Sequence, residues 1–432
     1  MDGKKVQRQQ TLFAVVCLFG FAALLRLTIG MSFINTFDTF WYRNWALDLP
    51  NGLFDVYTRA EEISLDYPPL YLFALYPIGK VYESLTPEGN YYIQMLLLKF
   101  FPLLFDMLCG LFLYRIFKSE GELTAIVAAM AWLCNPSMLF NSACWGQTDS
   151  IMAFLLLISF WYLNKGRPTL AAVLFAIAGL TKYQCLMFTP VFLLQLYFNH
   201  SKQWLRIGKA LLAAAATVAV VFLPFMIGSR DPLLFFKVYL TGADSYPYCS
   251  LYCFNLYGML GLDWSTDIPD TTPFIGPITY QMFGTFLLVL SMLLLLMLYI
   301  RGKCRNAWVG GLFIMQCIFM LTTRMHERYQ IIVLPFALMA WLTTRKRGFA
   351  ISYLLLSLMT LFNQVMVLLF HLHSGLQAPW EQCYPTLIIV MSALNFVLFL
   401  YTVYVCMRTF LVAEEQGQMT ETEVNVYADQ SA

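Results

Sequence analysis

The motifs FDTFWYRNWA (Phe37–Ala46) and LDYPPLY (Leu65–Tyr71) lie in one polar, aromatic stretch between two long apolar runs. A helix needs about 20 apolar residues to cross a bilayer, so the runs predict two membrane spans and the stretch between them an external loop. Proline fixes φ, and the double proline therefore stiffens the second motif. The side chains of these motifs to which we assign roles below are Asp38, Arg43, Trp45 and Asp66.

The composition of the whole chain is that of a membrane protein. Of its 432 residues, 59% are hydrophobic and 12% are charged, whereas charged residues make up about a quarter of a soluble domain. The first apolar run, residues 11–31, lacks the small-residue cleavage site of a signal peptide and is interpreted as an anchor. We predict an all-α polytopic fold with about twelve spans, which begin near Thr11, Tyr92, Leu123, Asp149, Thr169, Tyr183, Gly208, Thr279, Ala307, Tyr329, Phe349 and Thr386.

The basic residues predict the orientation, because Lys and Arg accumulate in cytoplasmic loops. With the N-terminus inside, 17 basic residues fall on the inner side and 8 on the outer side. The prediction is one transmembrane domain over residues 1–410, with large external loops at 32–91 and 229–278 and both termini cytoplasmic. The acidic, polar segment 411–432 is predicted to be disordered. The net charge of +2 gives no indication of nucleic-acid binding.

Asp38 is the candidate catalytic base. It follows the outer end of the first predicted span, and a carboxylate there can deprotonate an acceptor hydroxyl as the hydroxyl attacks a sugar anomeric carbon. Arg43 and Trp45 lie on the same short segment and are expected to contact the substrate. The alternative is that Asp38 caps the helical turn that follows it.

A second outer turn, RMHERY (Arg324–Tyr329), has the features of an anion site. Guanidinium and imidazole groups at the mouth of a helix bundle can bind a phosphate and offset its charge as it leaves. The expected phosphate ligands are Arg324, His326 and Arg328, joined by Lys182 from another outer turn, and Glu327 is expected to contact substrate. The alternative is a set of interfacial cations that contact lipid headgroups.

The outer turn WGQTD (Trp145–Asp149) provides a ring for stacking and two polar groups for sugar hydroxyls, on Trp145, Gln147 and Asp149. The alternative is that Thr148 or Asp149 caps the next span. Asp66 is likewise either a substrate ligand or the cap of a helix expected from Leu70 to about Tyr82.

Lys99 and Asp106 lie inside the second predicted span, where charged groups are functional candidates by default. They either join helices or belong to a lipid-linked sugar transporter or flippase, which is the alternative to an enzyme. A transporter places its polar site near the bilayer midplane and shows repeat symmetry, whereas here the polar residues gather at one surface and no internal repeat is found. Cys249 and Cys253 are either free or bridged, and no Cys/His cluster has zinc spacing.

These motifs resemble those of the GT-C superfamily of integral-membrane glycosyltransferases. The aspartate loop followed by LDYPPL is similar to the first luminal loop of dolichyl-phosphate-glucose glucosyltransferases of N-glycan assembly, in which the matching aspartate is the proposed base. The turn around His326 is similar to their His-Glu-basic motif, with Arg328 where that family usually has lysine. The WGQTDS turn and the Thr181-Lys182 turn resemble a bacterial branch related to GPI mannosyltransferases.

The resemblance implies an inverting hexosyltransferase that needs no metal or other cofactor. It implies a polyprenyl-phosphate-linked sugar as donor, a hydroxyl of a glycan or glycolipid as acceptor, and glucose or mannose as the transferred hexose. The only Asn-x-Ser/Thr sequon, at Asn199, is predicted to be cytoplasmic. That placement favours a bacterial plasma membrane over the alternative, the endoplasmic reticulum, with the active site on the outer face.

Overall fold

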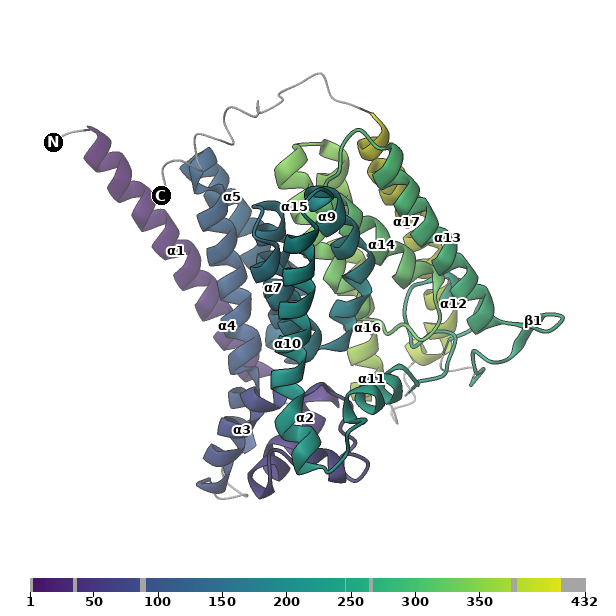
Figure 1. The fold of residues 1–432 in the computed structure, drawn as a ribbon. Helices are drawn as coiled ribbons and strands as arrows, with labels where there is room; N and C mark the ends of the chain where they lie inside the picture. Colours follow the sequence, from purple (N-terminus) through teal and green to yellow (C-terminus); the bar gives the residue numbers. More distant parts are fainter. Residues whose placement is uncertain are drawn as a thin grey trace.

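The computed structural model describes residues 3–33, 37–85, 91–244, 246–263, 267–373 and 379–412. These residues form an almost entirely helical bundle, and each of the twelve segments expected to span is helical (Figure 1). The first half contains α1 (Gly3–Ser32), α2 (Phe37–Asp48), α3 (Pro69–Glu83), α4 (Tyr91–Phe117), α5 (Glu122–Leu133), α6 (Pro136–Leu139), the π-helix η4 (Phe140–Trp145), α7 (Asp149–Asn164), α8 (Pro168–Thr181), the 3-10 helix η5 (Tyr183–Phe188), α9 (Thr189–His200) and α10 (Trp204–Gly228). The second half contains α11 (Leu234–Asp244), α12 (Leu256–Met259), β1 (Pro273–Ile275), β2 (Ile278–Thr279), α13 (Tyr280–Arg301), α14 (Ala307–Leu321), the 3-10 helix η7 (Tyr329–Ile332), α15 (Val333–Thr344), α16 (Arg347–His373) and α17 (Pro379–Leu411).

Several of these helices are suited to a bilayer. Among the described residues, α1, α4, α10, α13, α16 and α17 are long and apolar enough to cross one, and α5 with the segment after it makes a seventh if this pair, bent by 47°, is one span. Shorter apolar helices are α7, α8, α14 and the segment of η7 and α15. This is a multi-pass membrane protein. The predicted number of twelve spans is not confirmed.

Burial separates the centre of the bundle from its lipid side. Every residue of α14 from Ala307 to Met320 is buried, so this helix forms the core. In α1, by contrast, Leu12 and Phe13 are 64% and 71% exposed. Apolar side chains exposed on a spanning helix face hydrocarbon, which solvates them.

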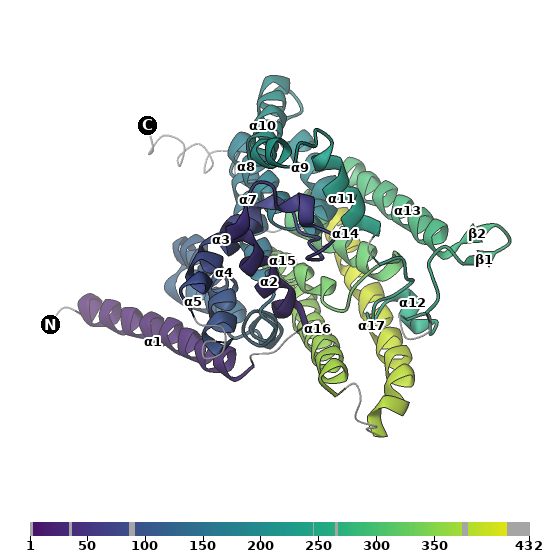
Figure 2. The same cartoon turned by 90° about the horizontal axis from the view of Figure 1, so that it is seen from below.

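The two large loops that were predicted to be external contain structure of their own. The first includes α2 and α3, and the second includes α11, α12 and a short antiparallel hairpin in which Pro273 pairs with Thr279 and Ile275 with Ile278. In Figure 1, α2, α3 and α11 lie at the lower end of the bundle, and the hairpin projects from its right side beside α13; Figure 2 shows α2, α3, α11 and α12 from below. Pro68 occupies the N-cap position of α3, so Asp66 is not its cap.

Lys99 and Asp106, the charged residues in the middle of α4, belong to separate networks that join helices. Asp106 forms an ion pair with Arg26 of α1 at 2.7 Å and accepts hydrogen bonds from Trp132 and Ser142. The Lys99 ammonium, which has three N–H donors, lies within hydrogen-bond distance of four backbone carbonyls, those of Gly30, Phe33, Ala143 and Cys144. Lys99 and Asp106 therefore join helices, as the first of the two alternatives for them expected. Cys249 and Cys253 are free thiols.

Gly146 ends the π-helix in a left-handed conformation with φ of 76°. A Cβ at this position would lie 2.8 Å from the Thr39 methyl group. Glycine therefore allows the chain after Trp145 to pass close to α2, which brings the WGQTD turn against the aspartate loop.

Candidate functional site

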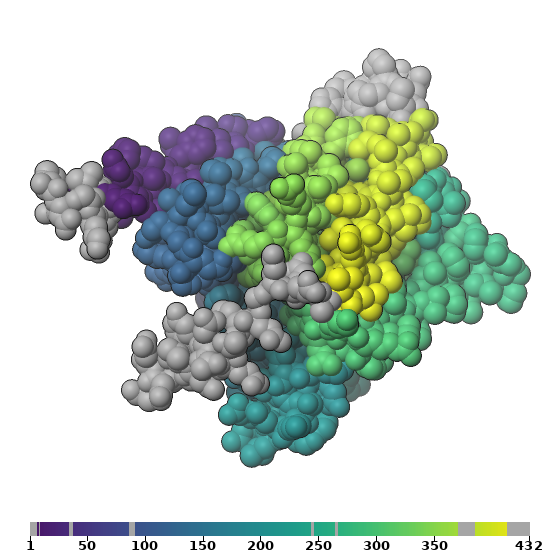
Figure 3. All heavy atoms as spheres, turned by 90° about the horizontal axis from the view of Figure 1, so that it is seen from above, coloured from purple at the N-terminus to yellow at the C-terminus, as the bar shows by residue number. Residues whose placement is uncertain are grey.

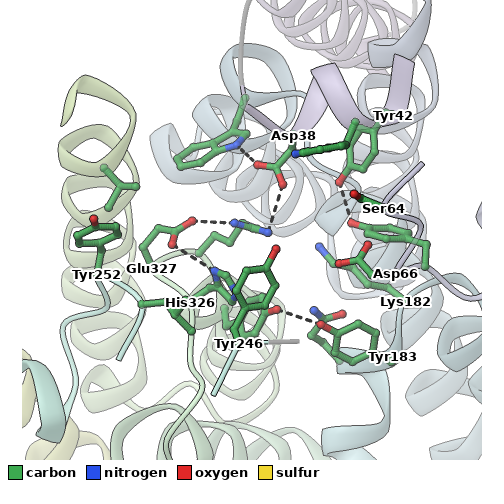
Figure 4. Close-up of a pocket in the computed structure, with 18 of the residues that line it drawn as sticks. Asp38, Tyr42, Ser64, Asp66, Lys182, Tyr183, Tyr246, Tyr252, His326 and Glu327 are labelled. Atoms are coloured by element: carbon green, nitrogen blue, oxygen red, sulfur yellow. Dashed lines mark hydrogen bonds and ion pairs between the residues drawn. The ribbon is translucent and has the colours of Figure 1, made fainter. Parts of the chain in front are cut away.

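A cavity of about 220 Å³ lies where the loops and turns that were predicted to be external meet. Residues from all five outer segments line it, together with parts of the second loop (Figure 4). The lining residues are Asp38, Trp41, Tyr42, Trp45, Ser64, Asp66, Tyr67, Trp145, Lys182, Tyr183, Gln184, Tyr246, Leu251, Tyr252, His326, Glu327, Arg328, Tyr329 and Val367.

Arg328 links two carboxylates of this cavity. Its guanidinium lies 3.3 Å from Asp38 Oδ1 and 2.8 Å from Glu327 Oε1. The other Asp38 oxygen accepts a hydrogen bond from the Trp145 indole N–H at 2.5 Å. Burial alone would lower the pKa of Arg328, but Asp38 and Glu327 outweigh it and hold that pKa well above its usual value. Asp38 thus has a fixed position, set by contacts from two distant segments.

Glu327 and His326 are neighbours in the same turn. His326 Nδ1 lies 3.7 Å from Glu327 Oε2, and the imidazole ring packs against Tyr246 and Tyr329 at centroid distances of 4.8 and 4.9 Å. Burial lowers the pKa of His326, so its imidazole is neutral near pH 7. Burial opposes the ionisation of Glu327, but Arg328 and His326 outweigh it and lower its pKa to about 2.

The second external loop holds this turn in place. The Leu251 amide donates to the Met325 carbonyl at 2.9 Å, and the Glu327 amide donates to the Leu251 carbonyl at 3.2 Å. Arg324 has a left-handed backbone with φ of 63°. Its guanidinium binds the buried carboxylate of Asp270 through Nε at 2.7 Å and Nη2 at 3.3 Å. Arg324 therefore helps to attach the loop to the turn.

Lys182 reaches the cavity from the junction of α8 and η5, where it is almost completely buried. Its ammonium forms an ion pair with Asp149, whose second oxygen accepts a hydrogen bond from Asn141 at 3.0 Å. Burial would lower the pKa of Lys182, but Asp149 outweighs it, so the pKa is raised and the ammonium stays charged. Asp149 therefore balances the charge of Lys182 and does not cap α7, whose N-cap Thr148 makes no side-chain cap bond either.

Asp66 differs from the other two acids of the cavity. Among the described residues its carboxylate has no hydrogen bond or ion pair with another side chain, although Lys182 lies beside it in Figure 4. Burial and the charge of Asp38 raise the pKa of Asp66 to about 6. Asp66 is therefore the carboxylate that is available to a ligand.

The structure brings eight of the predicted site residues to this cavity, namely Asp38, Trp45, Asp66, Trp145, Lys182, His326, Glu327 and Arg328. The four others lie outside the lining, each with its own partner. Arg43 donates to Gln94 at 2.8 Å, and Gln147 accepts from Tyr42 at 3.0 Å. Asp149 pairs with Lys182, and Arg324 lines a neighbouring cleft between η5 and α13.

The sequence analysis assigned no role to the tyrosines of the cavity. Tyr42, Tyr67, Tyr183, Tyr246, Tyr252 and Tyr329 all line the cavity. One signal was present, because Tyr42 follows Asp38 by four residues and so lies on the same face of a helix. The hydroxyls of Tyr42 and Tyr67 are 2.7 Å apart, and this pair forms one wall.

The described residues contain no group of three or more His, Cys, Asp or Glu side chains arranged to hold a metal ion. The ionic groups of the cavity are instead three carboxylates, one ammonium and one guanidinium, on Asp38, Asp66, Glu327, Lys182 and Arg328. Such a set can accept a proton from a hydroxyl and hold an anion within one small space.

Comparison with known proteins identifies a family for this chain. The sequence model described as glycosyltransferase family 87 matches residues 65–309, which is more than half of the chain. A search of curated proteins found no similar sequence. The matched region includes LDYPPLY, the WGQTD turn and Lys182.

Proposed function

Because the chain belongs to glycosyltransferase family 87, we propose that it transfers a hexose, glucose or mannose, from a polyprenyl-phosphate carrier to a hydroxyl of a glycan or glycolipid, with inversion at the anomeric carbon. Membership of the family makes the protein a glycosyltransferase. The observation that carries the finer proposal is the contact of Asp38 with Arg328 and Trp145 in a cavity at one end of a membrane bundle.

In the proposed reaction Asp38 is the base. The acceptor oxygen forms a bond to the anomeric carbon and gives its proton to the Asp38 carboxylate. The bond between that carbon and the phosphate oxygen breaks, and the phosphate takes the electron pair. General-base catalysis contributes about a hundredfold or more to such a step. Two contacts aim the carboxylate, from the Arg328 guanidinium and the Trp145 indole.

The phosphate would meet Arg328, His326 and Lys182. Lys182 supplies a buried positive charge, and charge-assisted hydrogen bonds to phosphate are the strong ones. The Arg328 Nε–H is buried and has no hydrogen-bond partner among the described residues, so it has a donor left for a phosphate oxygen. The neutral imidazole of His326 can donate one further hydrogen bond.

We assign recognition of the sugar to side chains of the cavity that can still contact a ligand. The carboxylate of Asp66 accepts hydrogen bonds from sugar hydroxyls, and Trp45, Trp145 and Glu327 complete the walls. Arg324 lies at the end of the neighbouring cleft, which shares Tyr183 with the cavity. We place Arg324 on the path by which the lipid-linked donor arrives, and Arg43, Gln147 and Asp149 act through the residues that they contact.

The proposed setting is a bacterial plasma membrane, with this cavity on the outer face and both termini in the cytoplasm. The rival function, a lipid-linked sugar transporter, rested on Lys99 and Asp106. Both residues belong to networks that join α1, α4 and η4, so they lend a transport pathway no support.

Transfer of labelled hexose in proteoliposomes tests the proposal. The purified protein receives polyprenyl-phosphate hexose on one side and a lipid acceptor, and Asp38→Asn is compared with the matched control Glu62→Gln, an exposed carboxylate of the same loop. We expect Asp38→Asn to lower the rate at least a hundredfold and Glu62→Gln to keep it. Normal transfer by Asp38→Asn would exclude Asp38 as the base, and donor translocation without transfer would favour the transporter.

A further inference from the structure

A second cavity, of about 630 Å³, lies at the other end of the bundle, between the first turn of α16 and the last turns of α17. Arg347 begins α16 and lines this cavity, whereas Val367 of the same helix lines the cavity of Asp38. Twenty residues of α-helix span about 30 Å, which is the thickness of the hydrocarbon core of a bilayer. Figure 3 shows the ends of α16 and α17 side by side from this direction.

The charged side chains that the structure describes around this second cavity are all basic. They belong to Lys346, Arg347 and Arg408, and no carboxylate is among the described residues that line it. Arg345, next in sequence, does form an ion pair, with Glu120, and does not line the cavity. Among the described residues neither Arg347 nor Arg408 has a carboxylate partner. Two guanidinium groups that share a cavity repel one another, and an anion between Arg347 and Arg408 would relieve that repulsion.

The walls of the cavity are amphipathic. Ile351, Val405 and Val412 give it an apolar side, whereas Tyr401 and Tyr404 place aromatic rings beside the basic groups. Aromatic and basic residues together at the end of spanning helices mark the level of lipid headgroups. A ligand that fits has a negative headgroup and an apolar tail.

We propose that this cavity binds the headgroup of an anionic phospholipid, with the phosphate between Arg347, Arg408 and Lys346. Basic pockets between spanning helices are known to hold anionic headgroups. The hydroxyl of Thr409, which accepts a hydrogen bond from Lys346 at 3.3 Å, fixes the position of one cation. The site is independent of the transfer reaction, because it lies at the opposite end of α16.

Native mass spectrometry of the full-length protein tests this proposal. Delipidated protein is titrated with phosphatidylglycerol and, separately, with phosphatidylcholine. The variant Arg347→Gln/Arg408→Gln is compared with Arg206→Gln/Lys209→Gln, which removes the same charge from exposed positions of α10. Each basic residue near an anionic bilayer surface contributes about a fivefold gain in affinity. We therefore expect phosphatidylglycerol affinity to fall about 25-fold in the first variant and to stay within about twofold in the second.

The other outcomes overturn the proposal. Equal loss in both variants means that binding follows overall charge, and no loss in either means that these cations only set the orientation of the chain. Displacement of the lipid by millimolar inorganic phosphate identifies a site for free phosphate. Binding that appears only in Glu414→Gln/Glu415→Gln means that the acidic end of the chain itself fills the cavity.

Discussion

The buried ion pair between Lys182 and Asp149 allows a quantitative prediction, because its two side chains are only 2% and 3% exposed. Replacement of Lys182 by Met leaves a buried carboxylate whose remaining partner is the amide of Asn141. Removal of one member of a buried pair costs about 3–5 kcal/mol. We expect Lys182→Met and Asp149→Asn each to lower the free energy of unfolding, measured by SDS titration in mixed micelles, by about that amount.

The double variant separates structure from function. Without either charge the desolvation penalty disappears, so Lys182→Met/Asp149→Asn should unfold within about 1.5 kcal/mol of the wild type, a coupling of at least about 4.5 kcal/mol. Its transfer activity should stay low, because the cation for the phosphate is still missing. As a control, Lys80→Met removes one member of an exposed pair with Glu83 and should cost less than about 1 kcal/mol. Additive costs of the two single variants would refute the reasoning.

Three further changes test other parts of the site. Asp66→Asn should raise the apparent Tm at pH 7.5 and change it little at pH 4.5. The folded pKa of Asp66 is raised to about 6, so this carboxyl destabilises the fold only as the pH rises above the pKa that it has in the unfolded chain. An equal change in Tm at both pH values would contradict this. Gly146→Ala should cost about 1–2 kcal/mol in SDS titration for the left-handed backbone alone, and Thr39→Ser, which removes the methyl group in contact, should recover part of any further loss. Asp270→Ala should lower the free energy of unfolding by about 2–3 kcal/mol, since it removes charge-assisted bonds to Arg324; an unchanged value would show that the loop is held without them.

The sequence predicted which residues line the cavity better than it predicted how their side chains are arranged. The predicted topology alone placed Asp38, Lys182 and His326 together. Each lies in a loop or turn that follows an odd number of predicted spans, and such turns share one side of a bilayer. Arg324 could not be excluded in this way. It stands two residues before His326, but its left-handed backbone and its bond to Asp270, which is 54 residues away, turn it to another cleft. No local pattern predicts a left-handed arginine.

The helices show a similar limit. The apolar runs predicted twelve segments that are helical in the structure, yet they gave no indication of the π-helix before Gly146 or of the 3-10 turns that precede α9 and α15. These irregular turns shorten or bend the segments and place Trp145 and Tyr183 on the cavity. Tertiary packing selects such turns, and packing is absent from a pattern of apolar residues.

The contact between Asp38 and Arg328 joins residues that the ribosome adds far apart in time. They are separated by 290 positions, and at about 5–20 residues per second the second follows the first by roughly 15–60 s. During that interval the guanidinium partner of Asp38 does not yet exist. A chain that stops before Arg328 lacks this ion pair and the His326–Tyr329 side of the cavity, so the site can form only after that turn has been synthesised.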